Sequence, residues 1–406
     1  MTDILTFTDQ AVQNCPFAAY ESLRDDQPVF KDPVTGHYIL TRYEDVRRAL
    51  LNHASLSNKT GFLGDRWSAE ANALFKERGW MPMDTLVSND PPDHRRFRTL
   101  VDKVFTTTKV TSLEPRINEI IAELIDAFPD DGEIDFLQAF AIPLPMFVIA
   151  EQLGVPREHR HRFKDWSDAA VESTSPTLTP EREMELAHIM IDMQRYMANE
   201  IERVRAEPND MLLSRLVNFE SEGRQLTVAE LQNVVRQILV AGNETTTTTL
   251  ASGMQALIEQ PALVEQLRND PARARGLAEE ILRTATPLQT LFRRAKEPLT
   301  IAGTDIPEGA IVEVRYGAGN HDPRQFACPA DIDLDRKNSA SHLAFGAGIH
   351  LCVGNQLARG ELRLAFEALT QRLVNFRYSR GEHSAVPVRG YITYGSSELW
   401  MTFDRR

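Results

Sequence analysis

The stretch FGAGIHLCVG, from Phe345 to Gly354, carries the strongest signal in the sequence. Its glycines allow positive φ angles in a tight loop, or a close backbone approach to a flat group. The apolar pattern of residues 357–364 predicts a helix, so Cys352 stands just before a helix N-terminus. The free N–H groups and partial positive charge of that end favour a thiolate. Cys352 is therefore a candidate thiolate, although an isolated cysteine beside a glycine-rich turn is more often buried and inert.

The same stretch matches F-x-x-G-x-[HR]-x-C-x-G, the cysteine signature of the cytochrome P450 family, at every fixed position. The sequence therefore resembles a soluble bacterial haem-thiolate monooxygenase of that family. The resemblance implies that Cys352 is the thiolate ligand of the iron of haem b, a ligand that pushes electron density toward O–O cleavage. It further implies that Phe345 and Gly346 lie against the haem, and that His350 binds a haem propionate.

Other basic residues occur where the family binds the haem propionates. His94 and Arg98 stand four apart in PPDHRRFR, on one face of an expected helix, and resemble the H-x-x-x-R pair of the family. Without the resemblance, this segment is typical of a solvated basic helix face. Arg293 falls at the position of another propionate arginine, although the adjacent Arg294 leaves the register open by one residue. Together with His350, these groups would hold two carboxylates by charge-assisted hydrogen bonds.

The segment Glu280–Arg283 resembles E-x-x-R, whose acid and arginine stand three apart on a helix. Such a pair is usually a surface ion pair worth roughly a few tenths of a kcal/mol. In the family the pair is buried and bonds an arginine of the meander that precedes the cysteine loop. HDPRQFACPADIDLDR matches this meander, with Arg336 as the third partner. We assign these residues to fold integrity and to support of the cysteine loop.

The segment AGNETT, from Ala241 to Thr246, matches A-G-x-[DE]-T-T of the family's distal helix. Gly242 inside a helix costs roughly 1 kcal/mol against alanine, so its presence needs a reason, and one reason is that the backbone passes close to the haem face. Cleavage of O2 needs protons in a dry pocket, and a carboxylate beside a hydroxyl can deliver them. We expect Glu244 and Thr245 to be the catalytic relay. Without the cysteine signature, the run Thr245–Thr249 would be only a structural helix segment.

Two other functions stay open from the sequence. A haem-thiolate protein could bind or sense a ligand without turnover, and a helical binding protein with a structural cysteine would hold no haem. The acid–alcohol pair favours a monooxygenase that uses O2 and two electrons, because relatives that use hydrogen peroxide directly tend to lack it. A red-shifted Soret band of the carbon monoxide complex excludes the second alternative, and O2 consumption with a redox partner excludes the first.

The chain as a whole is predicted to be mainly α, a helix-rich α+β protein with the cytochrome P450 fold and small β-sheets. Helices are expected over residues 113–128 and 182–207, and from the capping box at 227–230. Strands are expected over residues 37–41, 298–303, 310–316 and 391–403. Residues 60–92 show weak periodicity and are expected to form a long loop with one helical turn. No linker or repeat divides the chain, so we expect one domain over residues 1–406.

Composition excludes several classes of protein. The net charge of −13, from 45 basic and 58 acidic residues, argues against a general nucleic-acid-binding surface. No stretch approaches the roughly 18 apolar residues of a membrane span, and the first residues lack a signal pattern. The 3 cysteines suit a reducing compartment better than a disulfide scaffold. We therefore expect a cytoplasmic protein without membrane or nucleic-acid partners, and we expect it to be a monomer.

Substrate and electron donor follow from the resemblance. It implies four regions beside the substrate: Gly61–Leu86, the helix around Ala241, Leu288–Phe292 and Ile392–Tyr394. These regions are mainly apolar, which fits a hydrophobic small organic molecule; terpenoids, steroids, fatty acids and aromatic compounds stay open. Electrons are expected from a soluble ferredoxin or flavodoxin with its reductase. Its docking patch is expected on basic residues near the cysteine and the propionate-binding helix: Arg95, Arg96, Lys103, Lys109, Arg359 and Arg363.

Overall fold

The structure is a computed structural model, and it describes residues 5–60, 67–130, 132–173, 178–220, 223–388 and 390–406. The chain divides into two compact units. The first unit contains Met1–Ser57, Thr111–Leu144 and Thr245–Arg406, and the second contains Asn58–Val110 and Pro145–Glu244. The prediction of one domain over residues 1–406 stays a prediction.

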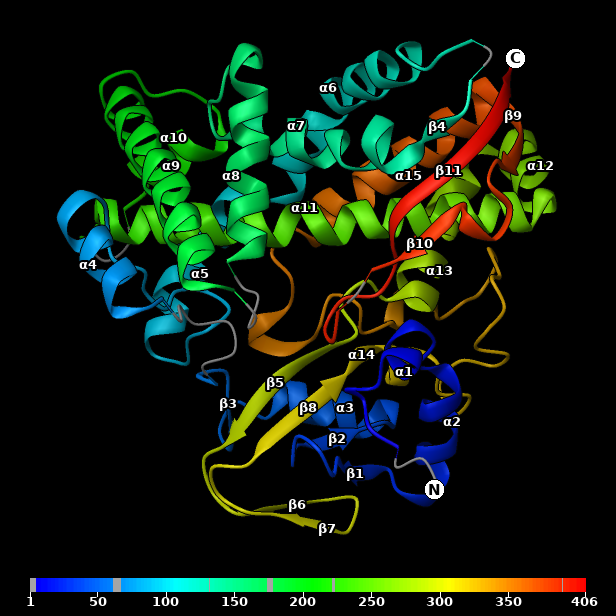
Figure 1. Cartoon of the computed structure of the whole chain (residues 1–406), viewed down its shortest axis with the longest axis horizontal. Coiled ribbons are helices and arrows are strands. Elements are labelled where there is room, and N and C mark those ends of the chain that lie inside the picture. Colours follow the sequence, from blue (N-terminus) through cyan, green and yellow to red (C-terminus); the bar gives the residue numbers. More distant parts are fainter. Residues whose placement is uncertain (1–4, 61–66, 131, 174–177, 221–222, 389) are drawn as a thin grey trace. The chain divides into compact units, whose positions relative to one another are not determined.

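The first unit holds the described strands together with the helices at both ends of the chain (Figure 1). Its α-helices are α1 Gln10–Asn14, α2 Phe17–Asp26, α3 Tyr43–Leu51, α12 Pro261–Asn269, α13 Ala274–Ala285, α14 Tyr316–Asn320 and α15 Asn355–Arg372. Shorter helical turns are η1 Leu137–Ala141, η3 Pro271–Arg273, η4 Ser339–Ser341, η5 Gly348–His350 and η6 Gly381–His383. The strands are β1 Val29–Lys31, β2 Tyr38–Leu40, β3 Leu56–Ser57, β4 Ile134–Asp135, β5 Thr290–Ala295, β6 Leu299–Ile301, β7 Thr304–Ile306, β8 Ile311–Arg315, β9 Leu373–Tyr378, β10 Ala385–Pro387 and β11 Ser396–Arg405.

The described part of the second unit is helical. Its helices are α4 Ala69–Arg78, α5 Asp93–Val104, η2 Arg157–His159, α8 Arg160–Glu172, α9 Pro180–Ala206 and α10 Leu212–Asn218. Three further helices include residues of both units: α6 Thr107–Asp126, α7 Pro143–Gln152 and α11 Val228–Glu259. Within the described residues, no helix combines the length and the apolarity needed to cross a bilayer.

The strands of the first unit form three small sheets. The largest has the order β1-β2-β8-β5-β3, in which β2 and β8 are parallel and the other neighbours are antiparallel. A second sheet has the order β10-β11-β4, and β9 pairs with β11. The third is the β6–β7 hairpin. Helices dominate and the sheets are small, so the predicted fold class is confirmed.

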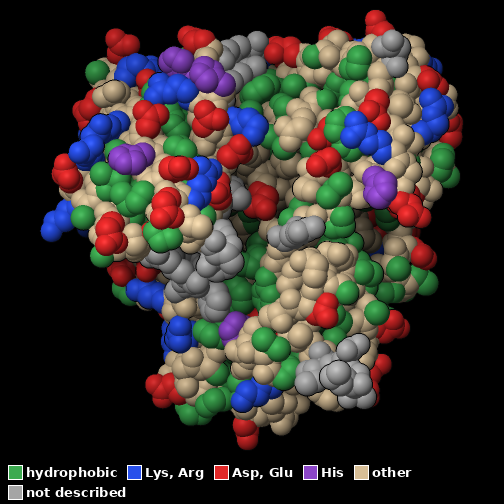
Figure 2. All heavy atoms as spheres, in the orientation of Figure 1, with side chains coloured by type: hydrophobic (Ala, Val, Ile, Leu, Met, Phe, Trp, Pro, Cys, Tyr) green, Lys and Arg blue, Asp and Glu red, His purple; other side chains and the backbone are tan. Residues whose placement is uncertain are grey.

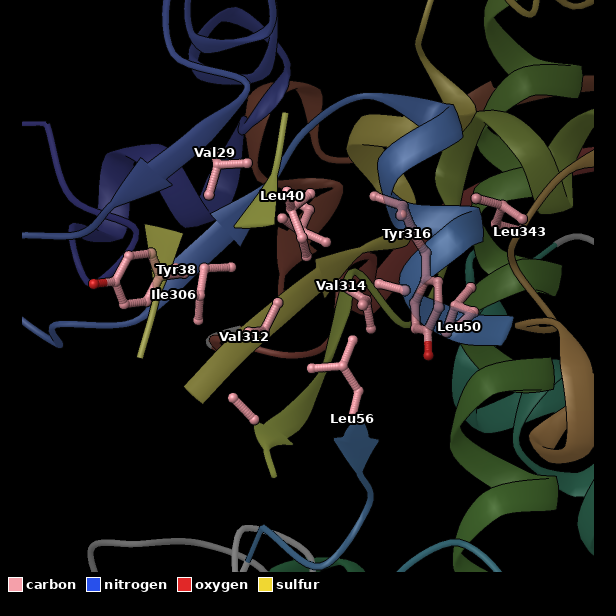
Figure 3. Packing of buried hydrophobic residues seen from close by; sticks show 14 residues of the cluster. Val29, Tyr38, Leu40, Leu50, Leu56, Ile306, Val312, Val314, Tyr316 and Leu343 are labelled. Atoms are coloured by element: carbon pink, nitrogen blue, oxygen red, sulfur yellow. The ribbon is translucent and has the colours of Figure 1, made fainter. Parts of the chain in front are cut away.

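A hydrophobic cluster packs the five-stranded sheet against α3 and the segment before the cysteine loop (Figure 3). Val312 and Val314 of β8 and Leu40 of β2 are completely buried in it. Leu50 comes from α3, and Leu343 precedes the cysteine loop. Burial of such side chains stabilises a fold by roughly 1.5–3 kcal/mol each. The start of the loop is therefore fixed by the same core that supports the sheet.

The position of α15 depends on one close approach. An ideal Cβ on Gly253 of α11 would lie 2.1 Å from the Phe366 ring of α15, so a larger residue would push this ring away. The buried face of α15 includes Leu362, Phe366 and Leu369. This face anchors the helix that begins just after Cys352.

Most elements appear where the sequence predicts them, and one does not. The long helices α6 and α9 match their predicted stretches, and the capping box is present: Glu230 N–H lies 3.3 Å from Thr227 Oγ1, and Thr227 N–H lies 2.8 Å from Glu230 Oε2. The predicted loop over residues 60–92 is wrong in part, because it contains the 10-residue helix α4. Ser68 caps this helix, but only Ala71 and Phe75 are buried, so its apolar stripe is too narrow for a periodicity signal.

Candidate active site

The loop that holds Cys352 is closed by its own backbone. The Cys352 N–H donates to the Phe345 carbonyl oxygen at 2.9 Å, which joins the two ends of the loop. Gly346 and Gly348 have φ angles of 69° and 71°, in the left-handed region that favours glycine. A Cβ on Gly348 would also lie 3.0 Å from the Leu50 carbonyl oxygen of α3. Backbone conformation and packing therefore both favour glycine at position 348.

Cys352 lies where the sequence predicts it, directly before a helix. Gly354 is the N-cap of α15, which begins at Asn355, and Cys352 itself is half-buried. The Asn355 side-chain amide donates to the Cys352 carbonyl oxygen at 2.6 Å. Because the N-terminus of a helix presents unpaired N–H groups and a partial positive charge, a thiolate is favoured at this place.

The segment before the loop is held by the predicted cluster on α13. Glu280 and Arg283 are both fully buried, and the guanidinium donates to the carboxylate at 2.8 and 2.9 Å. Arg336 Nε donates to the same carboxylate at 3.0 Å. Arg283 also donates to the carbonyl oxygens of Pro329 and Asp331. The predicted three-residue cluster is confirmed, and it fixes the chain that leads into the cysteine loop.

His94 and Arg98 lie one turn apart on α5, in the second unit. His94 is buried. Arg98 is half-buried, and its Nε donates to Asp102 Oδ1 at 2.7 Å. A guanidinium carries five N–H donors in a fork that matches a carboxylate. The pair presents two nitrogen-bearing side chains on one helix face, as the sequence predicts.

Arg293 and Arg294 are adjacent in β5, so their side chains point to opposite faces of the sheet. Arg293 is buried, with 3% of its surface exposed, whereas Arg294 is exposed. Arg293 Nη1 donates to the Phe292 carbonyl oxygen at 2.9 Å, and its side chain interacts with the Tyr316 hydroxyl. Among the described residues, no carboxylate lies within ion-pair distance of Arg293. A buried cation without an anion is costly, so this position is suited to bind one.

Glu244 and Thr245 follow one another in α11. Both are half-buried, whereas Thr246 to Thr249 are buried. Burial raises the pKa of Glu244, because it disfavours the charged form. The later hydroxyls are engaged with backbone: Thr247 Oγ1 donates to the Ala141 carbonyl oxygen at 3.0 Å, and Thr249 Oγ1 donates to that of Thr245 at 2.7 Å. Of the threonine run, Thr245 is thus the member with an accessible surface.

The residues around Cys352 fit a haem. A Cβ on Gly346 would meet only the His350 carbonyl oxygen, at 3.7 Å, so the loop is open on that side. Phe345, Ile349 and Val353 are half-exposed apolar side chains, a surface that suits an apolar group. The buried Arg293 supplies a cation without a carboxylate for an anionic substituent. A thiol, apolar cover and a buried cation together match an iron porphyrin with propionates.

A second set of side chains near the loop was not predicted. Glu279, the neighbour of Glu280, accepts hydrogen bonds from Arg359, and its Oε2 lies 3.2 Å from His342 Nε2. The sequence signal was limited to a second acid beside E-x-x-R and a histidine three residues before Phe345. Neither position belongs to the matched motifs, so motif reasoning could not identify them.

The predicted site residues fall into two groups. The first unit contains the cysteine loop, with Phe345, Gly346, His350 and Cys352. Arg293 of β5 and Thr245 of α11 also belong to this unit. His94, Arg98 and Glu244 belong to the second unit. Within the loop, a backbone hydrogen bond joins Cys352 to Phe345.

Comparison with known proteins identifies the family. Residues 34–386 match the family model described as Cytochrome P450. The chain is similar to cytochrome P450 107B1 of Saccharopolyspora erythraea, with 35% identity over 382 residues that cover 92% of this chain and 91% of that protein. It is also similar to a vitamin D(3) 25-hydroxylase of Pseudonocardia autotrophica, with 36% identity over 87% of this chain and 85% of that protein.

Among solved structures, CYP109Q5 from Chondromyces apiculatus superposes with a TM-score of 0.88 at 30% identity. This match covers 99% of the present chain and 98% of that structure. Sequence and fold thus agree along nearly the whole length, and relatives of this kind carry the names of hydroxylases. The chain belongs to the cytochrome P450 family and is a monooxygenase of that family.

Proposed function

We propose that this enzyme inserts one oxygen atom from O2 into a hydrophobic small organic molecule, using haem b held by Cys352. The observation that carries the proposal is the backbone-closed glycine loop, in which Cys352 stands directly before the N-terminus of α15. The name of the vitamin D(3) 25-hydroxylase supports hydroxylation of a hydrophobic compound as the reaction type.

The residues that would hold the haem divide by role. When bound, the haem supplies the redox chemistry that activates O2. The Cys352 thiolate would bind its iron, and Phe345 and Gly346 would help to hold the cofactor. Four side chains would bind the propionates by charge-assisted hydrogen bonds: His94, Arg98, Arg293 and His350. Between the two adjacent arginines, burial favours Arg293.

Glu244 and Thr245 would supply protons to the oxygen side of the pocket. A raised pKa lets the Glu244 carboxyl retain a proton closer to neutral pH, where a general acid works best. The Thr245 hydroxyl can donate a proton and accept another from its neighbour. Glu244 would therefore take up protons and Thr245 would present them.

Two of the four expected substrate regions lie side by side in the first unit. Gln289 N–H donates to the Ile392 carbonyl oxygen at 2.7 Å, and Tyr394 N–H donates to that of Pro287 at 2.9 Å. Leu288 pairs with Thr393 as an isolated bridge. These contacts support a substrate wall made from both regions. The part of the first region at residues 61–66 lies outside the described residues.

Electrons would come from a ferredoxin or flavodoxin with its reductase. Three of the six expected docking cations are engaged by acids within the chain: Arg96 by Glu230, Arg359 by Glu279, and Arg363 by Glu114. Arg95 and Lys103 of α5 are better candidates, because both side chains are exposed. A cytoplasmic location and a monomeric state stay predictions.

Replacement of the proposed ligand tests the function. Cys352→Ser should abolish the red-shifted Soret band of the carbon monoxide complex and product formation, because serine provides no thiolate. Cys15→Ser and Cys328→Ser, which change the two exposed cysteines, should keep both. The measurements are the carbon monoxide difference spectrum and O2-dependent product formation with a ferredoxin and reductase. An unchanged spectrum in Cys352→Ser would overturn the proposal.

A further inference from the structure

A line of hydrogen-bonded side chains connects α13 to the backbone of the proposed iron ligand. Arg359 of α15 donates to both oxygens of Glu279, at 2.6 and 3.2 Å. The same guanidinium donates through Nη1 to Asn355 Oδ1 at 2.9 Å. The Asn355 amide in turn donates to the Cys352 carbonyl oxygen at 2.6 Å. All four residues belong to the first unit, so the chain of bonds is continuous within it.

Glu279 also holds the other end of the loop. Its Oε2 lies 3.2 Å from Nε2 of the buried His342, and His342 Nδ1 accepts a hydrogen bond from the Ala344 N–H at 3.1 Å. The His342 ring lies 5.5 Å from the Phe345 ring, and the Arg359 guanidinium lies 4.5 Å from it. One carboxylate is therefore connected to both residues that flank the Phe345 ring.

The charges in this cluster are well defined. Burial by itself would raise the pKa of Glu279, but the neighbouring His342 ring and the hydrogen bonds and positive charge of Arg359 hold it at about 2. Burial lowers the pKa of His342, which favours its neutral form. A neutral ring that accepts at Nδ1 carries its proton on Nε2, toward Glu279. The ion pair of Glu279 and Arg359 is thus maintained over the whole physiological pH range.

This arrangement acts on Cys352 through its peptide group. The C=O and N–H of one trans peptide unit point in opposite directions, so a fixed Cys352 carbonyl also fixes the direction of the Val353 N–H. Hydrogen bonds in a chain polarise one another, so the cation at Arg359 strengthens donation from the Asn355 amide. The chain therefore fixes the direction of the Val353 N–H, the first backbone donor after the thiolate.

We propose that Glu279, through Arg359 and Asn355, is a positioning residue that tunes electron donation from Cys352 to the haem iron. The proposal rests on the proposed function, because it takes Cys352 as the iron ligand. It separates two adjacent acids of α13: Glu280 fixes the segment before the loop, whereas Glu279 adjusts the ligand itself. Loss of the chain should leave the thiolate with weaker hydrogen bonds and greater electron density, which stabilises ferric iron.

The test uses haem-loaded enzyme and two variants, Glu279→Gln and Asn355→Ala. Each should shift the ferric–ferrous midpoint potential to a more negative value by roughly 59 mV. For one electron, this shift corresponds to about a tenfold change in the equilibrium constant of reduction. Each should also raise, severalfold, the fraction of the carbon monoxide complex whose Soret band lacks the thiolate red shift. The readouts are spectroelectrochemistry and the carbon monoxide difference spectrum, both normalised to haem content.

Glu114→Gln is the matched control. Glu114 pairs at 2.7 Å with Arg363, one turn beyond Arg359 on the same helix, and its loss should leave potential and spectrum unchanged. A merely structural role of Glu279 would lower the urea midpoint in both Glu279→Gln and Asn355→Ala without moving the potential, and that result would overturn the proposal.

Two further outcomes are also decisive. If Glu279→Gln retains no haem, Asn355→Ala decides, because it keeps the Glu279–Arg359 ion pair intact; an unchanged potential in Asn355→Ala then rejects the tuning role. If the parent enzyme itself gives no thiolate-type carbon monoxide spectrum, the assignment of Cys352 fails. That failure concerns the proposed function and is distinguishable from a parent with a normal spectrum and unresponsive variants.

Discussion

Thr245 differs from the threonines that follow it in α11. Thr246 to Thr249 are buried, and three of their hydroxyls, those of Thr247, Thr248 and Thr249, bond to backbone carbonyls within the first unit. Thr245 is half-buried and follows Glu244, whose pKa is raised by burial. A run of identical side chains thus divides into a structural part and one position that is accessible for chemistry.

Thr245→Ala should uncouple electron consumption from product formation. Without the hydroxyl, protons are delivered poorly to the oxygen side, so the nicotinamide cofactor is still oxidised, but its electrons reduce O2 largely to hydrogen peroxide instead of supporting product formation. General acid–base contributions of about 100- to 10,000-fold make the loss of coupling easy to detect. Product formed per cofactor oxidised is the measurement, with haem content and substrate binding near those of the parent.

Thr249→Ala is the control for this experiment. It removes a buried hydroxyl that donates to the Thr245 carbonyl oxygen at 2.7 Å, so it should lower thermal stability and keep the coupling ratio. Full coupling in Thr245→Ala would show that this hydroxyl does not deliver the proton.

At the residue scale, the sequence could predict what a local spacing encodes. Glu280 and Arg283 stand three apart on a helix, and their motif names Arg336 as third partner, so that cluster was predictable. Glu279 and Arg359 are separated by 80 positions and meet only because α13 and α15 pack together. The choice between Arg293 and Arg294 likewise depends on which face of β5 is buried. This is set by the register of β5 against β8 and cannot be read from composition.

At the scale of elements, α4 shows a limit of periodicity. Its two buried residues, Ala71 and Phe75, give no clear amphipathic pattern, so the local signal is limited to its ends, with Ser68 as N-cap and Gly79 as C-cap. α6 shows the opposite case, since Ile117, Ile121 and Ile125 are buried at helical spacing. Elements with a broad buried face were predictable, and those with a narrow one were not.

The buried face of α15 contains an acid that no motif explains. Glu361 has 2% of its surface exposed, and burial raises its pKa to about 8. In the unfolded chain the same group titrates near 4.5. Between these two values the unfolded state releases a proton that the folded state keeps, so the stability of the fold falls as pH rises from 4.5 to 8.

Glu361→Gln should remove this pH dependence. Glutamine does not titrate, so the free energy of unfolding of the variant should be close to that of the parent near pH 5. Toward pH 8 it should exceed that of the parent by on the order of a few kcal/mol at most. Unfolding midpoints of the haem-loaded enzymes at several pH values measure the difference. Glu367→Gln changes a half-exposed acid on the same helix and should follow the parent. Parallel pH profiles of Glu361→Gln and parent would contradict the prediction.

At the scale of the whole molecule, charge is mixed rather than segregated on the face shown in Figure 2, where acidic and basic side chains are interspersed. The net charge of −13 therefore predicts neither the presence nor the position of a cationic docking site. Ion pairing within the chain is the information that the sequence lacked. It removes Arg96, Arg359 and Arg363 from the expected patch and leaves Arg95 and Lys103 exposed.

Charge reversal at Arg95 and Lys103 should slow reduction of the haem-loaded enzyme by an acidic ferredoxin. Attraction between exposed charges raises association rates and is screened by salt, with a Debye length of about 10 Å at 0.1 M. The double variant Arg95→Glu/Lys103→Glu should therefore be severalfold slower than the parent at low ionic strength, and the difference should shrink at high ionic strength. Stopped-flow reduction at a series of salt concentrations measures both effects.

Lys31→Glu/Lys76→Glu is the matched control, because it makes the same change in net charge at two other exposed lysines. If only total charge matters, both double variants slow equally, and the docking site is not at Arg95 and Lys103. Arg359→Glu provides the complementary case. Because Arg359 bonds Glu279 and Asn355, its reversal should disturb the carbon monoxide spectrum itself at every salt concentration. If the spectrum of Arg359→Glu stays normal and its reduction rate depends on salt like that of Arg95→Glu/Lys103→Glu, Arg359 belongs to the docking surface.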